Sequence, residues 1–232
     1  MSSSASDEVG GTWAILVAAG AGERLGSDRP KAFAALRGRP LLAESLERLE
    51  ASSWIDAIVV VAPPEWEEPA ILLAEELVAT KVTSVATGGA TRAESVRAGL
   101  AEVSPDALVV VVHDAARPLL TDAVIGRVLE PLGEGLDGAV PGLPLADTVK
   151  RVRGHEIVET LDRAELVAVQ TPQAFRADVL RAAFAGDLAG ATDCASLVER
   201  RGGRVRVVEG DSQLLKVTTR QDLERVERLL GG

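Results

Sequence analysis

The sequence lacks the means to form an internal disulfide, because Cys194 is the only cysteine among its 232 residues. A lone cysteine is typical of proteins from a reducing compartment. No apolar run approaches the roughly 18 residues needed to cross a bilayer. Residues 1–11 are polar and acidic, without the basic and apolar regions of a secretion signal. These absences predict a cytoplasmic protein, and we expect residues 1–11 to be a disordered tail.

Positive charge is also in deficit, since 25 Lys and Arg against 35 Asp and Glu give a formal net charge of −10. This total argues against a nucleic-acid backbone as partner. A small anionic substrate remains compatible, because the field in a cleft depends on the few cations that line it. The hydrophobic content of 47% is enough for one core, so we expect residues 12–232 to form a single domain.

Apolar stretches alternate with amphipathic segments along the first half of the chain. Segments with helical spacing separate continuous apolar runs of the kind found in strands buried on both faces. The runs occupy residues 13–18, 55–62, 82–86 and 107–112, and the helical segments occupy 40–51, 65–79 and 91–103. Pro40 suits a first helical position, and Thr91 with Glu94 matches a capping box. The alternation predicts an α/β fold with a doubly wound, mostly parallel sheet.

The pattern changes between about residues 145 and 166. Two short β-prone runs, 147–152 and 156–161, flank Arg153-Gly154 and predict a hairpin arm. An isolated two-stranded ribbon is only marginally stable in water, so we expect this arm to pack on another subunit. Beyond it, the sequence predicts helices near 178–184 and 193–201, a strand at 204–208 and a closing helix from 219.

A loop of small residues follows the first strand. Residues 18–26 read AAGAGERLG, and Pro30-Lys31 follows shortly after. Small residues let backbone amides close around phosphates, and Arg24 and Lys31 add positive charge. Gly-x-Gly alone is weak evidence, because tight strand exits need glycine for conformational reasons. The loop lacks the Gly-Lys-Ser/Thr of a P-loop and has Leu25 where a dinucleotide fold has its third glycine.

A second polar loop follows the apolar run at 107–112, in the region where ligands of open α/β sheets collect. Asp114 is a candidate for a ribose hydroxyl or for a place near Mg²⁺, and Arg117 is a candidate for a phosphate. The alternative is that Asp114 and Arg117 pair with each other. We expect His113 to fix the loop through a hydrogen bond to the backbone.

Taken together, the motifs resemble those of the 2-C-methyl-D-erythritol 4-phosphate cytidylyltransferase family. The resemblance spans about residues 12–230, and its most specific string is HDAARP at 113–118. The other matching segments are the glycine loop with Pro30-Lys31, GGATRAESV at 88–96, DTVK at 147–150, LDR at 161–163, QTPQAF at 170–175, Thr192-Asp193 and KVT at 216–218. The resemblance implies a Rossmann-like fold of the nucleotide-diphospho-sugar transferase type with a protruding β-hairpin arm.

For function, the resemblance implies transfer of CMP from CTP to 2-C-methyl-D-erythritol 4-phosphate in the non-mevalonate isoprenoid pathway, with Mg²⁺ held mainly through CTP phosphates. It implies a CTP site at Ala18, Ala19, Gly20, Gly22, Gly88, Gly89, Ala90, Ser95 and Asp114. It implies an acceptor site at Arg117, Thr148, Thr171 and Thr192, and catalytic cations at Arg24, Lys31, Arg163 and Lys216. Because Thr148 and Arg163 lie on the arm, it also implies a homodimer with shared sites.

Three alternatives remain open on the sequence. One is a cytidylyltransferase for another polyol phosphate such as ribitol 5-phosphate, and a second is a sugar-1-phosphate nucleotidyltransferase. The third is a nucleotide-binding regulator without catalysis. Two positions depart from the family pattern: Glu23 brings an anion to the phosphate loop, and Ala90 offers only backbone for base recognition. We interpret Cys194 as a packing residue rather than a nucleophile.

Overall fold

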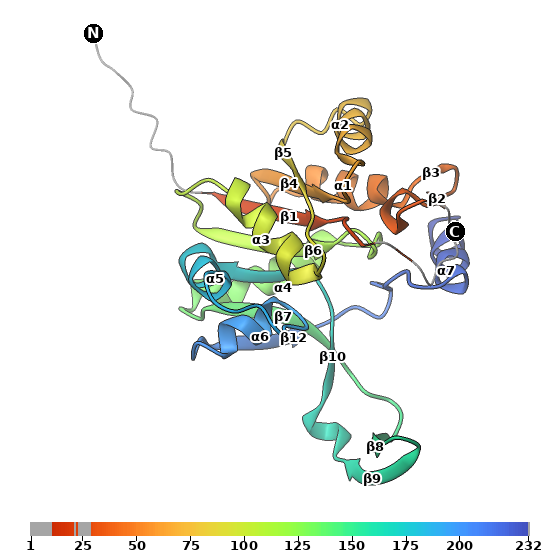
Figure 1. Cartoon of the computed structure of the whole chain (residues 1–232), viewed down its shortest axis with the longest axis vertical. Coiled ribbons are helices and arrows are strands. Elements are labelled where there is room, and N and C mark those ends of the chain that lie inside the picture. The colour runs from red at the N-terminus through yellow and green to blue at the C-terminus, as the bar shows by residue number, and fades with distance from the viewer. Residues whose placement is uncertain (1–10, 21, 23–28, 232) are drawn as a thin grey trace.

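The chain is described by a computed structural model that covers residues 11–20, 22 and 29–231. The expected disordered tail lies outside the described residues except for Gly11, and so does Arg24. A mostly parallel sheet forms the centre of the molecule (Figure 1). No helix in the described ranges is long and apolar enough to span a membrane.

The strands of the central sheet run in the order β10-β7-β11-β6-β1-β4-β5, and β12 pairs with β7. Within the described chain, β10 and β11 run antiparallel to their neighbours and the other pairs of this sheet are parallel. The strand bounds are β1 Thr12–Val17, β4 Ala57–Ala62, β5 Val82–Thr87, β6 Val109–Asp114, β7 Gly138–Pro144, β10 Val167–Val169, β11 Gln173–Arg176 and β12 Val205–Glu209. The predicted doubly wound α/β sheet is confirmed.

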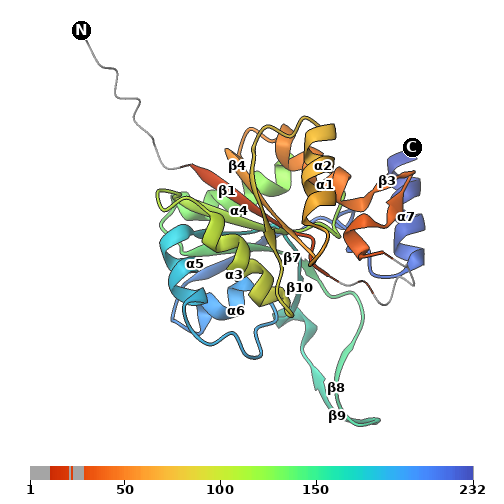
Figure 2. The ribbon, with the colours of Figure 1, turned by 45° about the horizontal axis from the view of Figure 1, so that its top comes forward.

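Helices cover both faces of this sheet (Figure 2). One face carries α1 (Leu41–Ala51), α2 (Glu67–Glu76) and α4 (Asp122–Gly133), and the other carries α3 (Arg92–Glu102), α5 (Ala177–Phe184) and α6 (Cys194–Glu199). Successive strand residues point to opposite faces. In β1, Ala14 and Leu16 therefore join the first layer while Ile15 joins the second, and all three are fully buried. Burial on both faces explains why this strand reads as a continuous apolar run.

Local signals set the ends of several elements. At α3, the Thr91 hydroxyl accepts from the Glu94 N–H at 3.1 Å while the Glu94 carboxylate accepts from the Thr91 N–H at 3.0 Å. This confirms the predicted capping box. A smaller apolar cluster joins the closing helix α7 (Arg220–Gly231) to Leu36 in the short strand β2 (Ala35–Leu36), which pairs with β3 (Arg39–Pro40).

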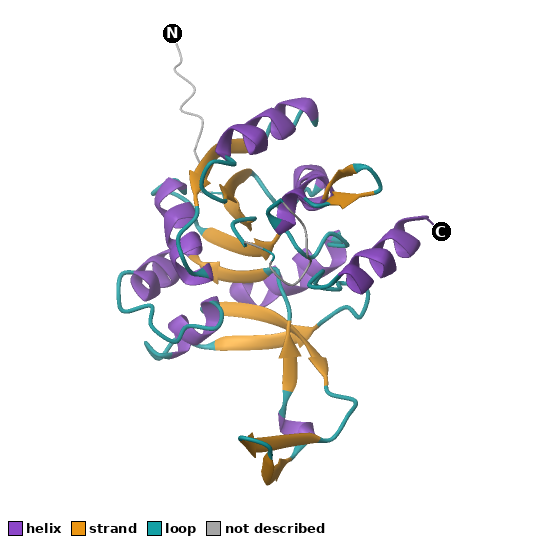
Figure 3. Ribbon diagram, turned by 45° about the vertical axis from the view of Figure 1, so that its right-hand side comes forward, coloured by secondary structure: helices purple, strands orange, loops and turns teal. Residues whose placement is uncertain are grey.

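The predicted arm is present as the two-stranded antiparallel pair β8 (Val149–Arg153) and β9 (Glu156–Leu161). Figures 1 and 3 show that it projects from the body of the molecule. Val152, Ile157 and Val158 on the arm are exposed in the single chain. Apolar side chains on so small a ribbon are what an interface between subunits would cover.

A close approach of α3 to the sheet supplies a test of the packing. Gly99 faces β1 and β4, and a Cβ there would lie 2.7 Å from methyl groups of Ile15 and Val61. Both neighbouring side chains are buried and β-branched, so they have few alternative rotamers with which to make room for a Cβ. Alanine gains about 1 kcal/mol in helix propensity, but overpacking costs about 1–3 kcal/mol. We expect Gly99→Ala to lower the free energy of unfolding, measured by urea titration.

The matched control is Gly126→Ala in α4, where a Cβ would meet the Trp54 ring at an ordinary 3.6 Å. This substitution should leave stability unchanged or raise it by up to about 1 kcal/mol. If both substitutions stabilise the protein, the tight packing of α3 on the sheet is contradicted.

Candidate active site

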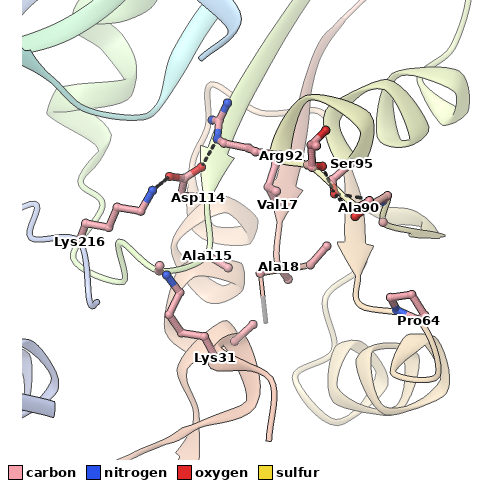
Figure 4. A pocket seen from close by; sticks show the side chains of 17 residues that line it. Val17, Ala18, Lys31, Pro64, Ala90, Arg92, Ser95, Asp114, Ala115 and Lys216 are labelled. Carbon is pink, nitrogen blue, oxygen red and sulfur yellow. Dashed lines mark hydrogen bonds and ion pairs between the residues drawn. The ribbon is translucent and has the colours of Figure 1, made fainter. Parts of the chain in front are cut away.

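Two cavities adjoin at the carboxyl ends of the parallel strands. The first, of about 610 Å³, lies between the end of β1, the N-terminus of α3 and the end of β6, and Lys31 also lines it (Figure 4). It gathers most of the residues predicted to bind CTP, namely Ala18, Ala19, Gly20, Gly88, Gly89, Ala90, Ser95 and Asp114. The first cavity is therefore the place where the sequence predicts the nucleotide.

The glycines of this cavity serve close packing. A Cβ on Gly88 would overlap the Cβ of Ala19, and one on Gly89 would overlap the side chain of Glu94. The Ser95 hydroxyl accepts from the Gly89 N–H at 3.1 Å and lies 2.9 Å from the Thr91 carbonyl oxygen. The turn between β5 and α3 is thus held against the end of β1, and it offers a ligand mainly backbone and small side chains.

Gly22 does not line the cavity, but it supports a residue that does. Its backbone has a φ of +76°, and a Cβ there would lie 2.6 Å from the Cβ of Lys31. Glycine adopts this conformation without strain and allows the backbone at Gly22 to lie directly against Lys31. The predicted role of Gly22 in forming the phosphate loop is therefore indirect in this structure.

The second cavity, of about 460 Å³, lies between β7, β10, β11 and α6. It gathers Arg117, Thr171, Thr192 and Lys216, which the resemblance placed near the acceptor or its phosphate. The sequence prediction missed other polar side chains that line it: Gln170, Gln173, Asp193, Ser196 and Glu199. Gln173 is nearly fully buried and donates to Asp193 at 2.9 Å, so it fixes the start of α6.

Asp114 lines both cavities. Figure 4 shows that two cations, Arg92 and Lys216, hold its carboxylate. The Arg92 Nε donates to its Oδ1 at 2.9 Å, and the Lys216 Nζ donates to its Oδ2 at 2.7 Å. The Asp114 side chain is only 8% exposed. Burial alone would raise the pKa of this carboxyl, but Arg92 and Lys216 outweigh burial and hold the pKa well below its usual range. The carboxylate is therefore ionised, and each of its two oxygens is paired with a cation.

Asp114 and Arg117 do not form the ion pair that the alternative interpretation expected. The carboxylate pairs with Arg92 and Lys216 instead, while the Arg117 Nη1 donates to the Leu214 carbonyl at 2.8 Å. The Arg117 Nε is buried and has no hydrogen-bond partner. Arg117 lines the second cavity, but this nitrogen is not open to a ligand there.

His113 fixes the loop through the backbone, as predicted. Its Nε2 lies 3.1 Å from the Arg117 carbonyl oxygen, and its Nδ1 lies 3.2 Å from the Thr171 hydroxyl. That hydroxyl also accepts from the Asp114 N–H at 3.1 Å. A neutral ring with its proton on Nε2 satisfies all these groups. Thr171 therefore holds Asp114 in place as well as lining the second cavity.

The two arm residues predicted near the acceptor lie away from both cavities of their own chain. Thr148 is exposed just before β8. Arg163, in the short 3-10 helix Arg163–Glu165, donates to the Ala146 carbonyl. Neither residue lines either cavity. One chain alone therefore does not bring these predicted acceptor residues to its own site.

Cys194 is a packing residue, as interpreted from the sequence. It is fully buried at the start of α6, and burial raises the pKa of its thiol to about 11. A thiol with this pKa is protonated at neutral pH and is a poor nucleophile. Its sulfur lies 3.6 Å from the Arg92 Nη1.

Arg92 is the main site residue that the sequence prediction missed, although it lies within a quoted motif. It is the first residue of α3 and lines both cavities. A cation is disfavoured at a helix N-terminus, where the backbone dipole is positive. An arginine at this position directly after a capping threonine is a signal that an anion elsewhere in the fold holds it.

Comparison with known proteins gives matches over nearly the whole chain. The family model for 2-C-methyl-D-erythritol 4-phosphate cytidylyltransferase matches residues 12–231. A protein of that name from Nocardia farcinica is 48% identical over 225 residues, which are 97% of this chain and 96% of that protein. The crystal structure of the Thermus thermophilus protein of that name is 32% identical, with a TM-score of 0.76 over 94% of this chain and 98% of that one. The 4-diphosphocytidyl-2C-methyl-D-erythritolsynthase structure from Anaerococcus prevotii is 25% identical, with a TM-score of 0.82 over 97% and 100% of the two chains.

The buried imidazole gives stability a defined pH dependence. Burial lowers the pKa of His113 from 6.5 to about 4, so the ring takes a proton in the unfolded chain before it does in the folded one. Stability should therefore fall as the pH falls from 6.5 toward 4. We expect a loss of about 2 kcal/mol between about pH 7.5 and pH 5, measured by urea unfolding.

Two variants separate this effect from general acid sensitivity. His113→Gln keeps an N–H donor near the Arg117 carbonyl and should flatten the pH dependence, whatever its stability at neutral pH. His155→Gln changes an exposed histidine and should retain the wild-type pH dependence. An equal slope in the wild type and His113→Gln would contradict the assignment.

Proposed function

Because the chain belongs to the 2-C-methyl-D-erythritol 4-phosphate cytidylyltransferase family, we propose that its two adjoining cavities are the CTP site and the acceptor site of one active centre. The enzyme transfers CMP from CTP to 2-C-methyl-D-erythritol 4-phosphate in isoprenoid precursor synthesis, with release of pyrophosphate. The observation that carries the arrangement is the common wall, since Arg92, Asp114 and Lys216 line both cavities.

In this proposal the first cavity binds CTP. The backbone at Ala18 to Gly20 faces the triphosphate, and the turn at Gly88 to Ala90 faces cytosine. A backbone lining without bulky side chains lets carbonyl and amide groups approach the edge of a base closely. Ala90 adds no polar group, so the backbone has to supply the hydrogen bonds at that position.

The reaction is a direct displacement at phosphorus. A phosphate oxygen of the acceptor forms a bond to the α-phosphorus of CTP while the bond from that phosphorus to the β-phosphate oxygen breaks, and the electron pair leaves with pyrophosphate. Negative charge grows on the α-phosphate oxygens, so positioning and fixed positive charge supply the catalysis. Lys216, in the common wall, would orient the acceptor phosphate, and Lys31, which lines the first cavity, would stabilise the charge on the α-phosphate. Arg24 has the same proposed role and lies outside the described residues.

A divalent metal fits this site if the substrate supplies most of its ligands. Among the described residues that line the first cavity, Asp114 is the one with a carboxylate. Both oxygens of this carboxylate already accept hydrogen bonds from cations. The described residues contain no cluster of three or more His, Cys, Asp or Glu suited to a metal. We therefore propose Mg²⁺ held mainly through CTP phosphates, where it would offset phosphate charge and assist departure of pyrophosphate.

The second cavity is proposed to bind the acceptor, with Arg117, Thr171, Thr192 and Lys216 around it. Thr148 and Arg163 would complete this site from the arm of a partner subunit in a cytoplasmic homodimer. Support comes from the arm's position away from both cavities of its own chain and from its exposed Val152, Ile157 and Val158.

The first test is pyrophosphate release with Mg²⁺, because the proposal predicts it only for a defined pair of substrates. CTP with 2-C-methyl-D-erythritol 4-phosphate should give release, while UTP or ATP in place of CTP should give much less. Ribitol 5-phosphate is the control acceptor. Preferential turnover of ribitol 5-phosphate would overturn the acceptor assignment, and CTP binding by calorimetry without turnover of any pair would indicate a regulator.

Shared sites can be tested by mixing two impaired variants and measuring activity with the acceptor near its wild-type KM, where a raised KM lowers the rate. Lys31→Ala should lower kcat by about 10²–10³, because it removes one electrostatic donor from the first cavity. Arg163→Ala should mainly raise the KM for the acceptor. In a mixed dimer, the pocket of the Arg163→Ala subunit would receive an intact arm from the Lys31→Ala subunit. That site should therefore work at the wild-type rate, which is roughly half of wild-type activity per mixed dimer.

The matched control mixes Lys31→Ala with a double variant that carries both substitutions, which leaves no intact site in any dimer. Formation of mixed dimers is verified with two different affinity tags. Confirmed mixed dimers without recovered activity would contradict the shared site, and so would recovery in the control mixture.

A further inference from the structure

The wall between the two cavities has a charge balance that depends on Arg92. Asp114 carries one negative charge, and Arg92 and Lys216 each carry one positive charge within 2.9 Å of it. The three groups together are net positive, which suits a wall placed between two anionic substrates. Without Arg92, the same wall would have no net charge.

The two cations are not equally free to meet a substrate. The Arg92 side chain is 25% exposed, whereas that of Lys216 is 40% exposed. Arg92 is fixed at the start of α3, and its Nη1 contacts the sulfur of the buried Cys194. Its Nη2 is buried and out of reach of a ligand in this arrangement. Arg92 is thus suited to neutralise Asp114, while Lys216 is the cation that can turn toward phosphate.

The backbone supports the same division of roles. Lys216 stands in a segment anchored to the loop after β6, because the Val217 N–H donates to the Ala116 carbonyl at 2.8 Å. The main chain at Lys216 is therefore fixed, and only its flexible side chain has to choose between Asp114 and a substrate oxygen. A carboxylate that Arg92 already neutralises competes less strongly for Lys216.

We propose that Arg92 is a positioning residue for cytidylyl transfer: by occupying and neutralising Asp114, it leaves the charge of Lys216 available to the acceptor phosphate. The inference rests on the proposed function of the two cavities. The proposed role differs from a purely structural one in two ways. The effect of Arg92 depends on its positive charge, and it requires the carboxylate of Asp114.

The test is a double-mutant cycle with a charge-matched control. Arg92→Gln removes the charge, and Arg92→Lys retains it. Asp114→Asn removes the anion, and the double variant Arg92→Gln with Asp114→Asn removes both. Steady-state kinetics with CTP and 2-C-methyl-D-erythritol 4-phosphate give kcat and the acceptor KM for each enzyme, and circular dichroism with thermal melting monitors folding.

We expect Arg92→Gln to lower kcat/KM for the acceptor by roughly 30-fold, mostly through KM, and Arg92→Lys to recover most of this loss. In the Asp114→Asn background, Arg92→Gln should cost less than about threefold, because the anion that it neutralised is gone. Equal losses in Arg92→Gln and Arg92→Lys would overturn the role of charge. Equal losses from Arg92→Gln in the wild-type and Asp114→Asn backgrounds would overturn the claim that Arg92 acts on Asp114.

If Arg92→Gln does not fold, the proposal can still be tested with the other variants. The double variant leaves no buried unpaired carboxylate, so it is compared with Asp114→Asn, and Arg92→Lys is compared with the wild type. A loss above about threefold in the first comparison contradicts the inference, because no anion remains for Arg92 to neutralise. Failure of the proposed function is separable, since it would appear as absent turnover in the wild type. Wild-type turnover with independent effects of the two substitutions would reject the inference alone.

Discussion

The pairing of the buried Asp114 carboxylate with Arg92 and Lys216 is the constraint on which the organisation of the site depends. A carboxylate that is 8% exposed needs both partners, and these come from the start of α3 and from the segment before α7. The ion pairs therefore fix three parts of the chain that lie far apart in the sequence. They also define where the first cavity ends and the second begins, so one charged group sets both the shape and the electrostatics of the active centre.

A network of buried hydrogen bonds fixes the backbone of Asp114 and so the position of its carboxylate. His113 bridges the Arg117 carbonyl and the Thr171 hydroxyl, and Thr171 in turn accepts from the Asp114 N–H. This network links β6 to the segment before β11, which runs antiparallel to β6. Because β11 runs antiparallel to β6, the segment that leads into β11 lies beside the carboxyl end of β6. This arrangement brings Thr171 into the lining of the second cavity.

Sequence patterns predicted those parts of the structure whose determinants are local. Continuous apolar runs marked β1, β4 and β6 within a few residues, and the capping box at Thr91 marked the start of α3. The pattern did not indicate α4 or β7, nor the antiparallel β10 and β11, which are three and four residues long and gain stability only from their neighbours. The role of Arg92 also depends on a distant contact: its place at the helix start indicates only that some anion holds it, and the partner Asp114 lies 22 residues away.

The common wall has a consequence for inhibition of this enzyme. The two cavities, of about 610 and 460 Å³, share the ion-paired residues Arg92, Asp114 and Lys216 in their lining. A single molecule with a cytidine at one end, a short polyol at the other and an anionic linker matched to Lys216 would address both cavities at once. Such a bisubstrate ligand would gain the effective concentration of a tethered second group, and its selectivity over other nucleotide enzymes would come from spanning Asp114.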